Sequence, residues 1–220
     1  MAGGRDDPPW ATFLTCCLSH LALFPTMKFL HRQNMLYEFS LSCFAALVSF
    51  MYHTSECFHR RLFLSTLQWH RLDNIGAISS ITITCLHLSC FESETVMDNL
   101  KFVFFFATLI LQEFDPWNVT YTVLPVFLGA LMVLMSHFLK PRRRKCIIRK
   151  KFLAGLTSCC FGAVFFSWGL DNRNDPFRIW HGLFHVCMGL GFYQFFISIR
   201  RRGKALHSED TNTVSVNIDV

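Results

Sequence analysis

Seven apolar runs follow one another along the chain, and short polar connections separate them. Most of the runs have the roughly 17–25 residues that a helix needs to cross the hydrocarbon core of a bilayer. The pattern therefore predicts an all-α membrane protein, a seven-transmembrane helix bundle. The expected spans cover about residues 10–30, 34–53, 72–91, 97–114, 119–139, 152–170 and 177–199. The fourth run is the weakest, because its dense apolar part covers only residues 102–111, and a bundle of six spans is the alternative.

The composition points the same way. Of the 220 residues, 52% are hydrophobic, 25 are phenylalanine and only 16% are charged, which is more apolar surface than most soluble domains can hide. The net charge of +6 raises nucleic acid as a partner, but the basic residues cluster beside apolar runs, as topology determinants do. We therefore expect a lipid bilayer around the protein and no nucleic acid.

The ten cysteines show neither a C-x-x-C pair nor the spacing of a secreted disulfide scaffold. Most of them lie inside apolar runs, where cysteine behaves as a small hydrophobic residue. The cysteines therefore predict no disulfide framework.

Basic residues predict the orientation of the spans. Lysines and arginines crowd residues 140–151 and residues 200–204. Two spans separate these clusters, so both lie on one side, which the positive-inside rule makes cytosolic. The chain then has a short extracellular N-terminus at 1–9, a seven-span domain at 10–199, and a basic, then disordered cytosolic tail at 200–220. We expect a multi-pass protein of the plasma membrane rather than of the Golgi or endoplasmic reticulum.

Five polar side chains are expected in one layer on the non-cytosolic side. The second span ends with Ser49 and His53, the third opens at Asp73, and the seventh opens with His181 and His185. Histidines four residues apart share one face of a helix. Three imidazoles are a frequent ligand set of catalytic zinc, which leaves the fourth position to water. The spacing therefore predicts zinc ligands at His53, His181 and His185.

The same layer offers groups for hydrolysis. Zinc lowers the pKa of a bound water toward about 7, and a nearby carboxylate such as Asp73 takes its proton. Ser49 lies one turn before His53, where its hydroxyl can support the water or a substrate carbonyl. The alternative is that a membrane histidine only makes an interhelical hydrogen bond. We assign to that class the other histidines of the spans, His20, His87 and His137.

The arrangement Ser49-x3-His53, Asp73 and His181-x3-His185 resembles the signature of the CREST superfamily, whose seven-span members include alkaline ceramidases, adiponectin-type receptors and GPI-processing hydrolases. The stretches 21–26, 50–53 and 72–77 are similar to its transmembrane-8, or myomaker-like, branch. The resemblance covers about residues 18–200 and implies the seven-span fold with a zinc site.

That branch contains two functional types. One is a zinc-dependent, phospholipase A2-like hydrolase that acts on GPI-anchored proteins and has a large extracellular region. The other is short, promotes membrane fusion and lacks the serine and the aspartate. This chain is short but has Ser49 and Asp73.

From the residues and the resemblance together, we expect a zinc hydrolase that cleaves an acyl ester or amide bond of a membrane lipid or GPI lipid, in a phospholipase A2-like or ceramidase-like reaction. The alternatives are a non-catalytic, myomaker-like fusion or remodelling factor with structural zinc, and a ligand receptor with the same fold. Whether the chain forms a homo-oligomer is left open.

Overall fold

The computed structural model describes residues 7–139, 146–171 and 174–199. Within these ranges the regular elements are helices, and β-pairing is limited to two isolated bridges. The all-α prediction is therefore confirmed for the described part of the chain. The predicted cytosolic tail, residues 200–220, lies outside the described residues.

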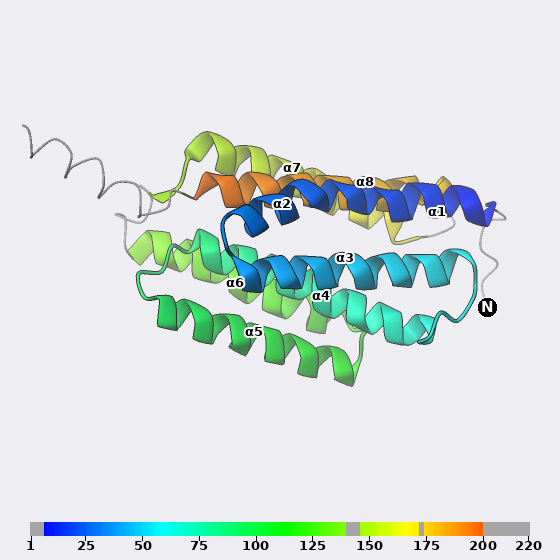
Figure 1. The fold of residues 1–220 in the computed structure, drawn as a ribbon, viewed down its shortest axis with the longest axis horizontal. Helices are drawn as coiled ribbons and strands as arrows, with labels where there is room; N and C mark the ends of the chain where they lie inside the picture. The colour runs from blue at the N-terminus through cyan, green and yellow to red at the C-terminus, as the bar shows by residue number, and fades with distance from the viewer. Residues whose placement is uncertain (1–6, 140–145, 172–173, 200–220) are drawn as a thin grey trace, which may run out of the picture.

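Helices occupy each of the seven places that the apolar runs predicted, and they pack side by side in one bundle (Figure 1). The first place holds three consecutive pieces, which are α1, the 3-10 segment η1 and α2. The elements are α1 (Pro9–Leu18), η1 (Ser19–Leu23), α2 (Phe24–Arg32), α3 (Leu36–Cys57), α4 (Thr66–Leu88), α5 (Glu94–Phe114), α6 (Val119–Leu139), α7 (Arg149–Gly169), η3 (Pro176–Arg178) and α8 (Ile179–Ser198).

Three of these helical rods are long and apolar enough to cross a membrane. They are Pro9–Arg32, α6 and α7. Helices α3, α4 and α8 do not meet the same measure, and these are the helices that carry the predicted polar site residues. The structure therefore supports membrane association through these three rods.

The start of α4 differs from the prediction. Ser65 caps this helix: its hydroxyl accepts a hydrogen bond from the Gln68 amide, and the Gln68 side chain bonds back to the Ser65 amide. This capping box satisfies two amide groups that a helix start leaves unpaired. The helix thus begins at Thr66. Asp73 lies in its third turn and does not open the helix, contrary to the prediction from the sequence. Asp73 is therefore not a cap.

The basic start of α7 lies at the opposite end of the bundle from the start of α8, which carries His181 and His185. The start of α1, the connection from α3 to α4, and η3 lie at one end (right in Figure 1). Helix α7 begins, and α8 ends, at the other end, where Ile147 and Ile199 form an isolated bridge. The basic start of α7 is therefore separated by the length of the bundle from the end where α3 finishes and α8 begins.

Two glycines on α8 allow the first rod to approach closely. A Cβ atom at Gly182 would stand 2.7 Å from the Thr15 carbonyl oxygen, and one at Gly189 would stand 2.6 Å from the Ala22 carbonyl oxygen. Small residues permit such close contact between helix backbones in membranes. These contacts place α1 directly against the segment of α8 that carries His181 and His185.

At the end of the bundle where α3 and α5 begin and α4 ends, a buried ionic cluster joins these three helices. Glu38, which is 5% exposed, accepts hydrogen bonds from His87 Nε2 at 2.8 Å and from Lys101 Nζ at 2.6 Å. His137 Nε2 donates to the Leu88 carbonyl oxygen at 2.8 Å. The prediction of interhelical hydrogen bonds is therefore confirmed for His87 and His137.

Candidate metal centre

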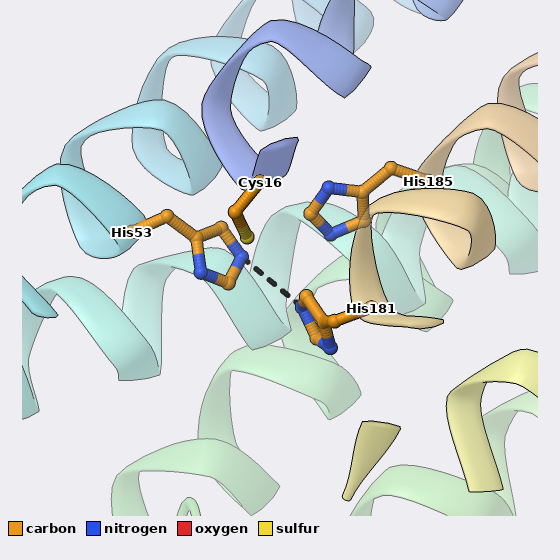
Figure 2. A group of neighbouring side chains, drawn as sticks. All are labelled: Cys16, His53, His181 and His185. Atoms are coloured by element: carbon orange, nitrogen blue, oxygen red, sulfur yellow. Dashed lines mark hydrogen bonds between the residues drawn. The ribbon is translucent and has the colours of Figure 1, made fainter. Parts of the chain in front are cut away.

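Four potential metal ligands converge between α1, α3 and α8. They are Cys16, His53, His181 and His185, and their ligand atoms all lie within 4.8 Å of one another (Figure 2). Cys16 and His53 are 0% exposed. The structure therefore brings together the three histidines that the sequence placed at one depth, and it adds a thiol to them.

The distance between two of the imidazoles suits one ion. His53 Nε2 and His181 Nε2 are 3.3 Å apart. Two nitrogens that bind one tetrahedral zinc at about 2.0–2.1 Å lie roughly 3.3–3.4 Å from each other. The ring of His185 completes the group, with centroids 5.0 Å from His53 and 4.7 Å from His181. Both the donor chemistry and the spacing therefore fit zinc.

Glu56 orients the first of these rings. Its carboxylate accepts a hydrogen bond from His53 Nδ1 at 3.3 Å, so the lone pair of His53 Nε2 points toward His181. The same carboxylate accepts from the Tyr52 hydroxyl at 3.4 Å and pairs with Arg178 at 3.6 Å. A carboxylate behind a metal-binding histidine fixes the ring and makes it a better ligand. Sequence reasoning missed this role of Glu56.

Residues outside the metal-ligand group also fix the two histidines of α8. The Ser19 hydroxyl donates to the Cys16 carbonyl oxygen, so its oxygen accepts from His185 Nδ1 at 3.1 Å and leaves Nε2 of that ring free. Asp175 is 1% exposed and accepts from the backbone amides of Trp180, at 2.8 Å, and His181, at 3.1 Å. This carboxylate fixes the first turn of α8 and with it the position of His181.

Ser49 lies beside the metal-ligand group and has two acceptors for its proton. Its oxygen is 2.7 Å from His20 Nε2, and His20 Nδ1 donates to the Cys17 carbonyl oxygen at 3.0 Å. Because a carbonyl only accepts, Nδ1 carries a hydrogen, and in the neutral ring Nε2 accepts from Ser49. The Asp73 carboxyl also interacts with the Ser49 hydroxyl and lies near His53. His20 and Asp73 therefore compete for a single proton.

The prediction that groups His20 with ordinary interhelical histidines is incomplete. Its bond to Ser49 is interhelical, but its ring also lies 4.1 Å from the His185 ring, at the edge of the metal-ligand group. The sequence does contain a signal for this placement. Cys16-x3-His20 repeats the spacing of Ser49-x3-His53 and of His181-x3-His185, so both members face the same side of the first rod.

A family model covers most of the chain, including every candidate site residue. The model described as "Protein of unknown function (DUF3522)" matches residues 8–186. The chain belongs to this family. In this DUF3522 protein the match begins just before α1 and ends one residue after His185, so it spans the metal-ligand group with Ser49 and Asp73. No curated protein matches the chain.

Proposed function

We propose that this DUF3522 protein is a zinc-dependent membrane hydrolase that cleaves an acyl ester or amide bond of a membrane lipid or GPI lipid. The observation that carries the proposal is the meeting of His53, His181 and His185 within 4.8 Å of one another, with the Nε2 atoms of the first two at a distance, 3.3 Å, that suits one tetrahedral ion. Asp73 and Ser49 lie next to these ligands, where hydrolysis needs a base and a hydrogen-bond donor. The resemblance to the CREST superfamily supports the same assignment.

The proposal includes seven spans with the N-terminus outside and the C-terminus in the cytosol, in the plasma membrane. Three rods apolar enough to cross a bilayer support it. So do the large apolar side chains on the surfaces of α6 and α7, such as Phe127, Phe138 and Phe161. With the basic start of α7 on the cytosolic side, the metal-ligand group lies toward the outer leaflet. A lipid of that leaflet is the substrate that reaches it most directly.

Each residue has a defined part in such a reaction. His53, His181 and His185 hold the zinc, which supplies Lewis acidity and makes water acidic enough to attack near neutral pH. Asp73 takes a proton from the attacking water and returns it to the leaving oxygen or nitrogen. Ser49 donates a hydrogen bond to the carbonyl oxygen, on which negative charge develops. Water and the acyl bond are thereby converted to an acid and an alcohol or amine.

Metal analysis and lipid turnover of the purified protein in detergent test this function. We expect about one zinc per chain, because three histidines form one ligand set, together with hydrolysis of ester- or amide-linked lipids. Asp73→Ala is expected to keep its zinc and lose turnover. Asp98→Ala is a matched control, because Asp98 is an exposed carboxylate at the far end of the bundle. Wild-type protein with no bound zinc, or Asp73→Ala with full turnover, contradicts the proposal.

Cys16 favours a second candidate, a non-catalytic membrane fusion or remodelling factor with structural zinc. With the thiol, the chain offers four ligands, and structural zinc sites are usually closed in this way. Cell–cell fusion assays separate the two candidates. Fusion that persists in Asp73→Ala but is lost in His185→Ala supports the structural role, because only the second change removes a ligand.

A further inference from the structure

Cys16 occupies a different kind of position from the histidines. It lies on α1, whereas His53 lies on α3 and the other two imidazoles lie on α8. Its sulfur points into the space between the rings (Figure 2), and it lies within 4.8 Å of a ligand nitrogen of each of the three histidines. Three imidazoles and a thiolate fill the four positions of a tetrahedral zinc. The donor set as a whole therefore leaves no position for water.

The neighbouring cysteine shows that this contact is specific to one face of α1. Cys17 is also buried, at 3% exposed, but its sulfur lies 3.6 Å from the Thr54 hydroxyl and contacts Cys57. It is not among the potential ligands. Cys17 therefore offers a thiol of equal size and similar burial, one residue away, that does not face the metal-ligand group.

The helix that carries Cys16 is linked to the rest of its rod by a weaker element. The 3-10 segment η1 begins three residues after Cys16 and separates α1 from α2. Hydrogen bonds of 3-10 geometry are poorer than those of an α-helix, and such a stretch within a helix often marks a hinge. A movement of α1 about η1 displaces the thiol while the three histidines on α3 and α8 keep their places.

We propose that Cys16 is a displaceable fourth zinc ligand, which closes the metal centre at rest and admits water when α1 moves away. This inference rests on the proposed zinc hydrolase and adds its regulation. In the exchange, the zinc–sulfur bond breaks, a water molecule takes the vacated position, and the thiolate takes up a proton from solvent. No oxidant or reductant is consumed. The lipid substrate or a membrane partner that contacts α1 provides the displacement.

Cobalt substitution tests the ligand assignment without any activity measurement. Cobalt(II) bound by a thiolate shows a sulfur-to-metal charge-transfer band in the near ultraviolet. We expect this band in the wild type and in Cys17→Ser, and its loss in Cys16→Ser, with about one metal per chain in all three because the histidines remain. Cys16→Ala serves as a second variant, with thermal unfolding in detergent as the check of folding. A wild type that binds cobalt without this band overturns the inference.

Access of a small anion tests the closing of the centre. Azide is expected to change the visible cobalt spectrum of Cys16→Ser, and to leave the wild type and Cys17→Ser unchanged. Zinc-loaded Cys16→Ser is expected to hydrolyse lipid faster than Cys17→Ser. Equal azide response in the wild type and Cys16→Ser, or equal turnover in the two serine variants, overturns the proposal that Cys16 closes the metal centre.

The two proposals fail in different ways. A wild type without bound metal overturns both the proposed zinc hydrolase and the proposed closing of its metal centre by Cys16. A wild type that binds metal and hydrolyses lipid but lacks the thiolate band overturns only the role of Cys16.

Discussion

The Nε2 atom of His20 lies 2.7 Å from the hydroxyl oxygen of Ser49, which joins the first rod to α3 beside the metal-ligand group. His20 is held in the matching tautomer by the Cys17 carbonyl oxygen. Before a substrate carbonyl accepts it, the Ser49 proton is therefore directed toward His20 unless Asp73 takes it. This competition makes His20 a positioning residue for the proposed hydrolysis.

Replacing His20 is expected to reduce catalysis more than metal binding. His20→Ala leaves all three predicted imidazole ligands in place, but it removes one acceptor of the Ser49 proton, which then turns to Asp73. We expect kcat to fall about 10–100-fold, the range for partners that orient ligands and catalytic groups, with zinc content and KM nearly unchanged. Kinetics and metal analysis on the same preparation measure this. His137→Ala, at the far end of the bundle, is the control, and a parallel loss of zinc in His20→Ala argues against the positioning role.

Removing a predicted ligand is expected to empty the metal centre. His185→Ala leaves two imidazoles and Cys16, and the zinc content should fall well below one per chain after dialysis. Zinc addition should then no longer raise the melting temperature, because ligand binding stabilises only a fold that contains the site. His87→Ala, whose ring binds Glu38 at the other end of the bundle, should retain its zinc. Equal zinc content in the two variants contradicts the assignment of His185.

Glu56 is expected to tune zinc affinity from behind His53. Glu56→Gln preserves the size of the side chain but removes the negative charge next to His53 Nδ1. Loss of such a partner typically lowers metal affinity about 10–100-fold. Competition with a zinc chelator measures the change. Glu113→Gln is the control, because Glu113 is an exposed carboxylate paired with Arg71. An affinity that is the same in both variants shows that Glu56 does not support the ligand.

The close approach of the first rod to α8 predicts a stability difference between two glycines. The Cβ of Gly189→Ala would stand 2.6 Å from the Ala22 carbonyl oxygen, so backbone must move, and we expect a loss of about 1–3 kcal/mol. In Gly162→Ala the nearest atom is the flexible Met188 sulfur at 3.3 Å, and the effect should be small. Unfolding in mild detergent compares the two. Equal free energies of unfolding for the two variants would mean that Pro9–Arg32 can move away from α8 without loss of stability.

Local patterns along the chain were enough to find the helices and part of the site. The apolar runs located all seven helical places because run length and polarity are properties of the neighbouring residues. The boundaries of α3 and α4 differed, because α4 starts at the capping box of Ser65 and α3 continues to Cys57, and the length of an apolar run indicates neither. The expected layer containing His53, His181 and His185 follows from counting residues along apolar helices, and the structure brings these histidines together. Their role as zinc ligands stays a prediction.

The sequence by itself determined the helical class, the places of the helices and the position of each polar side chain along its helix. Only the tertiary structure decided which side chains touch across helices, and so it added Cys16, His20 and Glu56 to the site. Position along one helix follows from a fixed rise per residue. Lateral neighbours depend instead on how helices rotate and pack, here through the small residues Gly182 and Gly189, and no single helix contains that information.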